Sequence, residues 1–147
     1  MALPARSGHH QRMTMTLLLV DDSELILASL RGLLEGIPGI NAIRSADSLA
    51  HALDSVRLLP PTLVVLDLHL ADGNAITVIP RIKQLAPRAQ IAMLTNDATQ
   101  ANRNKCLAAG AHWFFDKSTE YETLLDVVRT HAAQQELINN KEGNTHE

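Results

Sequence analysis

The chain has 147 residues, of which 46% are hydrophobic and 20% are charged, and its formal net charge is -3. This length and composition suit one globular domain with a core, and the weak negative charge offers no general attraction to nucleic acid or to an anionic membrane. The single cysteine, Cys106, excludes an internal disulfide and favours a cytoplasmic location, and no apolar stretch is long enough to span a membrane.

Both ends of the chain are polar and irregular in pattern. Residues 1–15 lack the apolar centre of a secretory signal and are expected to form a flexible extension. Residues 133–147 are expected to form a polar tail. The folded domain is therefore expected over residues 16–132.

Short apolar runs alternate with helical patterns throughout this domain. The first half predicts strand, helix, strand, helix and strand over residues 16–20, 22–35, 40–46, 47–59 and 62–67. The last of these runs is rich in β-branched residues and continuously apolar until it ends in Asp67. Such a run is typical of a central parallel strand that is covered on both faces.

The second half of the domain continues the alternation. It predicts helix, strand, helix, strand and helix over residues 73–86, 89–95, 97–110, 111–116 and 118–138. Pro80 should kink the first of these helices or delay its start, and Gly110 is expected to form a left-handed cap on the second. Five strands alternating with five helices predict an α/β fold, a doubly wound parallel sheet with helices on both faces.

Reactive polar side chains follow four of the five expected strands: Asp21 and Asp22, Asp67, Thr95 and Lys117. Because parallel strands end at the same edge of a sheet, these side chains should gather there. Taken singly, each has an ordinary explanation, such as a helix cap, a turn, a strand preference or a surface lysine. These separate explanations would together require that chance had placed all five side chains at one edge of the sheet.

Three neighbouring carboxylates repel one another unless a cation lies between them, and one lysine cannot neutralise three acids. Oxygen ligands alone favour Mg²⁺ over zinc. A carboxylate beside Mg²⁺ and an ammonium group is a suitable phosphoryl acceptor, because both cations offset the charge of the transferring group.

Four segments together resemble the receiver domain of bacterial two-component response regulators: "LLLVDDSE", "LVVLDLHLADG", "IAMLTND" and "GAHWFFDKS". They stand in the family's order and at about its spacing across nearly all of residues 16–132. The resemblance is either to single-domain regulators of the chemotaxis type or to the isolated receiver of a longer regulator. It implies a flavodoxin-like fold with strand order 2-1-3-4-5.

The resemblance also implies a phospho-acceptor signalling module rather than an enzyme. Asp67 would receive a phosphoryl group from a histidine kinase or a histidine phosphotransfer protein. Mg²⁺ would be held by Asp67, by Asp22 and through it Asp21, and by the backbone carbonyl of His69.

Thr95 and Lys117 would bind the phosphoryl group, and Phe114 stands where the family places an aromatic switch residue. The fourth helix, fifth strand and fifth helix would bind a downstream protein partner, or a second copy in a homodimer. Direct contact with nucleic acid is not expected, because residues 133–147 are too few for a helix-turn-helix domain, and neither is membrane insertion. Trp113 is either an exposed partner anchor or a packed residue.

Two alternatives remain open. A phosphorylation-independent adaptor would keep the fold, and Ala71 and Ser118, where the family often has proline, favour it; the intact set of reactive residues argues against it. A magnesium-dependent aspartyl phosphohydrolase would also place a nucleophilic aspartate after a strand. That class typically has a second aspartate where this chain has His69, and the chain has no room for a cap domain.

Overall fold

The structure, a computed structural model, describes residues 15–144 and the side chains of residues 15–138. The strands are β1 (Met15–Val20), β2 (Ile40–Ala46), β3 (Leu63–Leu66), β4 (His69–Leu70), β5 (Gly73–Asn74), β6 (Gln90–Thr95) and β7 (Trp113–Asp116). The helices are α2 (Glu24–Leu34), α3 (Leu49–Leu58), α4 (Ile79–Leu85), α5 (Gln100–Ala109) and α6 (Tyr121–Asn144), with a 3-10 turn, η1 (Ala75–Val78), before α4.

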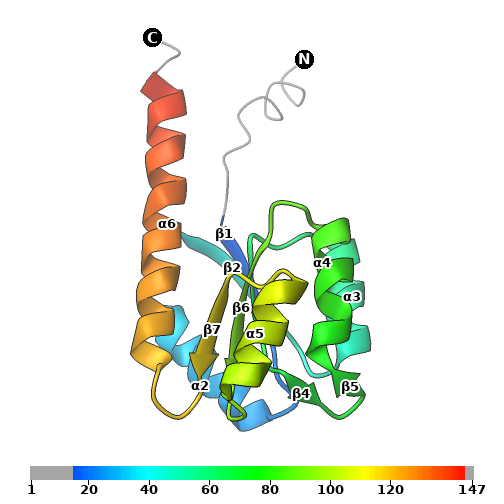
Figure 1. Cartoon of the computed structure of the whole chain (residues 1–147). Helices are drawn as coiled ribbons and strands as arrows, with labels where there is room; N and C mark the ends of the chain where they lie inside the picture. Colours follow the sequence, from blue (N-terminus) through cyan, green and yellow to red (C-terminus); the bar gives the residue numbers. More distant parts are fainter. Residues whose placement is uncertain (1–14, 145–147) are drawn as a thin grey trace.

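Five of the strands form one parallel sheet in the order β2-β1-β3-β6-β7. Counting these strands alone, this is the expected order 2-1-3-4-5, so the predicted doubly wound, flavodoxin-like fold is confirmed. Helices α3, α4 and α5 cover one face of the sheet, and α2 and α6 cover the other (Figure 1).

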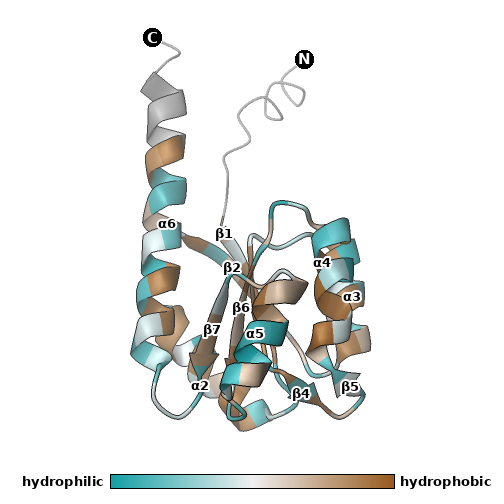
Figure 2. Ribbon diagram, in the orientation of Figure 1, coloured by the Kyte–Doolittle hydropathy of each residue, from teal (hydrophilic) through white to brown (hydrophobic). Residues whose placement is uncertain are grey.

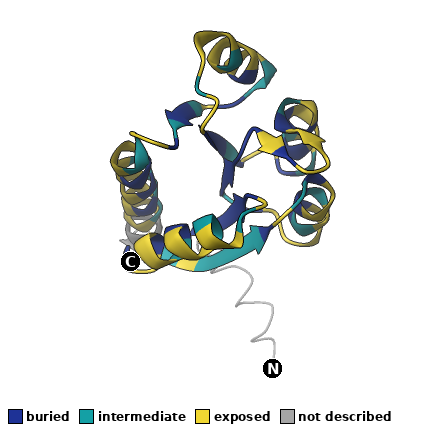
Figure 3. Ribbon diagram, turned by 90° about the horizontal axis from the view of Figure 1, so that it is seen from below, coloured by how far each residue is buried: buried dark blue, intermediate teal, exposed yellow. Residues whose placement is uncertain are grey.

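The core consists of two apolar clusters, one on each face of the sheet. Alternate residues of a strand point to opposite faces, so Leu18 and Val20 join the α3–α4–α5 side while Leu17 and Leu19 join the α2–α6 side. The central strand β3 is apolar throughout, whereas the helices carry polar residues on their outer faces (Figure 2). Viewed toward one edge of the sheet, buried strands are ringed by helices with exposed outer sides (Figure 3).

Short-range signals set the helix ends. Ser23, Ser48 and Thr99 are N-caps whose hydroxyls accept backbone N–H groups. Pro80 delays the start of α4, which is preceded by the turn η1. Gly110 closes α5 at φ +121°, in the region of positive φ that favours glycine.

In each of the two edge strands, one backbone group is hydrogen-bonded to a polar side chain from outside the strand. At β2, the Arg31 guanidinium donates to the Ile43 carbonyl and to Ser45 Oγ, both at 2.8 Å. At the end of β7, the Asp116 N–H donates to Glu120 Oε1 at 2.8 Å. Within the described residues, none of the helices combines the length and the apolar composition that crossing a membrane requires.

Three details differ from the expectations. Met15, assigned to the extension, is the first residue of β1 and is fully buried; the rest of that extension lies outside the described residues. Helix α6 continues to Asn144 through much of the expected polar tail. The segment after β3 forms a two-stranded antiparallel hairpin, β4–β5, which the apolar pattern did not indicate.

Candidate functional site

Among the described residues, the buried polar or charged side chains are Asp21, Asp67, Thr95 and Lys117. All four had been predicted to lie at one edge of the sheet. Since a buried polar group is unfavourable without a partner, their concentration at the ends of β1, β3, β6 and β7 marks this edge as the candidate site.

Backbone hydrogen bonds extend the sheet by one residue beyond β1, β3 and β7 and so bring these side chains to the same edge as Thr95. The N–H of Asp21 donates to the Ala46 carbonyl at 3.1 Å, and the N–H of Asp67 donates to the Val20 carbonyl at 3.0 Å. On the other side of the site, the N–H of Lys117 donates to the Thr95 carbonyl at 2.8 Å.

Lys117 links two of the acids. Its Nζ donates to Asp21 Oδ2 at 2.6 Å and to Asp67 Oδ2 at 3.0 Å, and all three side chains are largely buried. Burial alone would lower the pKa of Lys117, but the hydrogen bonds and charges of Asp21 and Asp67 outweigh it, and the pKa is raised. The ammonium group therefore stays charged.

Lys117 only partly compensates the negative charge of the buried Asp67 carboxylate. Burial raises the pKa of the Asp67 carboxyl, the neighbouring Asp21 adds to the effect, and Lys117 opposes both. One positive charge shared between two buried acids leaves a net negative charge at the site, which a bound cation could offset.

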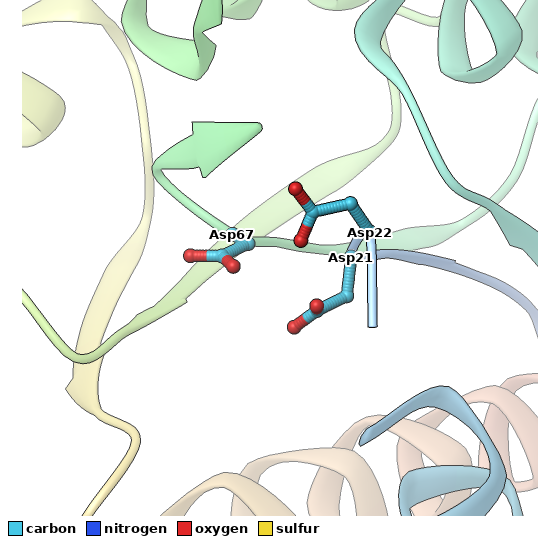
Figure 4. Close-up of side chains that lie close together, drawn as sticks. All are labelled: Asp21, Asp22 and Asp67. Atoms are coloured by element: carbon cyan, nitrogen blue, oxygen red, sulfur yellow. The ribbon is translucent and has the colours of Figure 1, made fainter. Parts of the chain in front are cut away.

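The oxygen ligands that such a cation needs are present. One carboxylate oxygen from each of Asp21, Asp22 and Asp67 lies within 4.8 Å of the others (Figure 4). Asp22 is exposed, whereas Asp21 and Asp67 are buried. This set of hard oxygen donors fits Mg²⁺ and not a metal that prefers sulfur or nitrogen.

An open cavity of about 340 Å³ lies beside Asp67. Its lining residues are Asp67, His69, Thr95, Asn96 and Asp97. Asp67 and Thr95 are buried, whereas the side chains of His69 and Asp97 are 55% and 47% exposed. His69 and Asp97 thus form the outer part of the cavity.

Sequence analysis did not single out Asp97. Its carboxylate Oδ2 is 2.7 Å from His69 Nε2, and the His69 hydrogen bond holds the pKa of Asp97 below its ordinary value. The N–H of Asp97 donates to Thr95 Oγ1 at 3.0 Å. Nothing in the sequence joins His69 to Asp97 except that both follow strands that end at this edge.

Asp72 anchors the hairpin that follows Asp67. Its two carboxylate oxygens accept the N–H groups of Leu49 and Ala50, at 2.9 and 3.1 Å, in the first turn of α3. These bonds hold the pKa of Asp72 below its ordinary value. A loop with Ala71 in place of proline is therefore still fixed to a helix.

Two predicted aromatic positions lie on β7. Phe114 is buried in the cluster on the α3–α4–α5 side. Trp113 is half-buried and packs against the α2–α6 cluster, so it is a packed residue. The switch role of Phe114 stays a prediction.

Comparison with known proteins identifies the family of this domain. Residues 17–129 match the family described as the response regulator receiver domain. The DNA-binding transcriptional activator DevR/DosR of Mycobacterium tuberculosis is 28% identical over 123 residues, which are 84% of this chain and 57% of that protein. The chain spans about half the length of the curated relatives it matches.

Solved structures show the same fold. A response regulator from Burkholderia pseudomallei, crystallised with a phosphorylated aspartic acid, calcium ion and citrate, has a TM-score of 0.71 and 26% identity, covering 87% of this chain and 74% of that one. A CheY-like receiver domain protein from Methanospirillum hungatei has a TM-score of 0.74 and 25% identity, covering 84% and 98%.

Proposed function

Because this chain belongs to the response regulator receiver domain family, we propose that it is the phospho-acceptor module of a two-component system, with Asp67 as the acceptor. Family members are signalling proteins rather than enzymes with an external substrate. The observation that carries the proposal is the position of Asp67, buried between Lys117 and the other acids and open to a cavity.

In the proposed reaction an Asp67 carboxylate oxygen attacks the phosphorus of a phosphohistidine on a histidine kinase or phosphotransfer protein. An oxygen–phosphorus bond forms, the nitrogen–phosphorus bond breaks, and the imidazole leaves with the electron pair and takes up one proton from water. The product is an aspartyl phosphate. No proton need leave Asp67, because the carboxylate is already the nucleophile.

The side chains around Asp67 have separate tasks. Lys117, 3.0 Å from Asp67, keeps one carboxylate oxygen oriented and offsets charge on the transferring group. Thr95 lines the same cavity, and its hydroxyl proton is free to donate to a phosphoryl oxygen because its bond to Asp97 uses only an acceptor lone pair.

Mg²⁺ is the cofactor that the carboxylates fit. Asp22, Asp67 and the backbone carbonyl of His69 would hold it, with Asp21 close by. When bound, Mg²⁺ would offset negative charge on the acids and on the phosphoryl group. Asp21, which contacts Lys117 at 2.6 Å, keeps the lysine beside the acceptor.

The proposed readout is the face formed by α5, β7 and α6, which correspond to the fourth helix, fifth strand and fifth helix of the sequence-based description. Helix α5 has one buried residue, Cys106, so little packing energy opposes its displacement. We propose that phosphorylation moves the loop after Thr95 together with Phe114, and that this face then binds a protein partner or a second copy.

The test is phosphorylation by acetyl phosphate in the presence of Mg²⁺. We expect a mass increase of one phosphoryl group, and its loss in Asp67→Asn and on chelation of the metal. Asp54→Asn, the same exchange at a 77% exposed side chain of α3 that does not line the cavity, is the matched control and should leave the phosphoryl gain unchanged.

Other outcomes would point to the alternatives. No phosphoryl gain in the wild-type protein, together with unchanged partner binding, would favour the phosphorylation-independent adaptor. Steady turnover of an external phosphate ester would favour the aspartyl phosphohydrolase.

A further inference from the structure

The outer part of the phosphorylation cavity contains a fourth acid, Asp97, which makes a close contact with His69 at 2.7 Å. A carboxylate can only accept hydrogen bonds, so His69 Nε2 must carry the proton in this contact. The two residues come from different loops, one after β3 and one after β6, and their side chains are half-exposed.

Backbone atoms of Asp97 make two hydrogen bonds within the segment after β6. The Asp97 N–H donates to Thr95 Oγ1, and the Asp97 carbonyl accepts from Asn102 Nδ2 at 2.9 Å. Both bonds use backbone atoms of Asp97. The contact with Thr95 therefore does not use the Asp97 carboxylate, which lies beside His69 and the Asn102 amide.

The Asp97 carboxylate affects the charge of the cavity. An anionic phosphodonor must approach Asp67 through a cavity that Asp97 lines, and Asp21, Asp22 and Asp67 already make the site acidic. A bare Asp97 carboxylate would repel the donor further, whereas a proton-bearing nitrogen bound to that carboxylate reduces its field.

We infer that His69 is a positioning residue that masks the Asp97 carboxylate and so lets anionic phosphodonors enter the site. Removal of His69 acts in opposite directions on the two ions that the site handles: it slows the approach of the anion and favours the cation. The inference rests on the proposed function in taking Asp67 as the acceptor.

The experiment compares wild type, His69→Ala, Asp97→Asn and the double variant in two assays. One is the rate of phosphorylation by acetyl phosphate in Mg²⁺, at low and high ionic strength. The other is Mg²⁺ affinity without a phosphodonor, measured by nuclear magnetic resonance titration. His51→Ala is the matched control, because His51 contacts Asp47 at 3.3 Å in an exposed pair that does not line the cavity.

We expect His69→Ala to lower the rate of phosphorylation by about two- to fivefold at low salt, because one carboxylate charge at the cavity mouth is no longer masked. High salt should reduce the difference in rate between this variant and wild type. Its Mg²⁺ affinity should equal or exceed that of wild type. Adding Asp97→Asn should restore the rate, and Asp97→Asn alone should raise the rate and weaken Mg²⁺ binding. His51→Ala should change neither quantity.

A purely structural role for His69 would weaken the binding of both ions, so a loss of Mg²⁺ affinity in His69→Ala would overturn the inference. The inference would also be overturned if adding Asp97→Asn to His69→Ala did not restore the rate of phosphorylation. Absence of phosphorylation in wild type would contradict the proposed function, while the Mg²⁺ titrations would still test the masking of Asp97.

Discussion

Asp67 illustrates how a residue can be placed for reactivity at the expense of stability. Burial raises its pKa, so ionised Asp67 is less favourable in the folded protein than in the unfolded chain. The sign follows from linkage: a carboxyl whose folded pKa is raised loses stability as pH rises from its ordinary pKa of 3.8 through the raised value.

We therefore expect Asp67→Asn to increase the free energy of unfolding at neutral pH without Mg²⁺, because the amide keeps the shape of the side chain and removes the buried charge. Denaturant unfolding at pH 7 measures this. Thr77→Ala, an exposed position on η1, serves as the control substitution. A less stable Asp67→Asn protein would show that Lys117 compensates the buried charge fully.

At the opposite edge of the sheet, His112 makes a contribution to the stability of the fold that depends on pH. Its Nδ1 accepts the N–H of Ile91 at 3.0 Å, which requires an unprotonated nitrogen. Burial, and then the nearby Lys83, lower the pKa of His112 below its ordinary 6.5. A histidine with a lowered folded pKa makes the fold less stable as pH falls through 6.5 toward that lower value.

We expect His112→Asn to weaken this acid sensitivity, because the asparagine oxygen can accept the Ile91 N–H but does not titrate there. The measurement is melting temperature between pH 7.5 and about 5, relative to wild type. Burial also lowers the pKa of His131, so part of the sensitivity should persist. Identical pH profiles for the two proteins would contradict the role of His112.

The chemically reactive residues could be predicted because parallel strands place their carboxyl ends together. That rule brought Asp21, Asp67, Thr95 and Lys117 to one edge, where the structure has them. It could not predict that Asp21, rather than Asp22, is the buried acid bound to Lys117. The direction of a side chain just beyond a strand depends on local turns that a pattern of apolar residues does not report.

At the scale of elements, substitution of two glycines by alanine should change the stability of the fold in opposite directions. Gly110 has φ +121°, and an added Cβ would lie 2.7 Å from Lys83 Cδ. Gly32, in the exposed part of α2, has open space around it. The same substitution should therefore have opposite effects at the two positions.

Gly110→Ala should lower the free energy of unfolding by about 1–2 kcal/mol, the usual consequence of forcing a side chain into this backbone region. Gly32→Ala should raise it by about 0.5–1 kcal/mol, because alanine favours the helix. Urea denaturation of both variants against wild type provides the comparison. Equal signs would mean that backbone conformation does not govern these sites.

The elements that sequence analysis misjudged lacked a local signal. The hairpin β4–β5 has only two residues in each strand, too few for a period to be recognised. Helix α6 runs on through polar residues, and polarity alone does not end a helix. Gly110 and Pro80 act locally, and their effects on the end of α5 and the start of α4 were predicted.

At the scale of the molecule, the packing is uneven. Strand β3 is buried at all four positions and has neighbours on both sides, whereas α5 has a single buried residue. Local opening should therefore be easiest at α5. The central place of β3 follows from the sheet order that the family resemblance implied.

We expect the amide protons of α5 to exchange with solvent faster than those of α3, which has three buried residues, and much faster than those of β3. Hydrogen exchange followed by mass spectrometry tests the order. Protection of α5 equal to that of β3 would show that α5 is held as firmly as the core.

The hydrogen bonds at the edge strands β2 and β7 bear on how this protein avoids aggregation. A row of free backbone groups invites strands from other molecules, and long, flat, apolar margins lead to fibres. Here the Arg31 guanidinium occupies one carbonyl of β2, that of Ile43, and Glu120 occupies the N–H of Asp116 at the end of β7. An incoming strand would first have to displace a charged group at either margin, which protects a crowded solution of this protein against sheet-to-sheet aggregation.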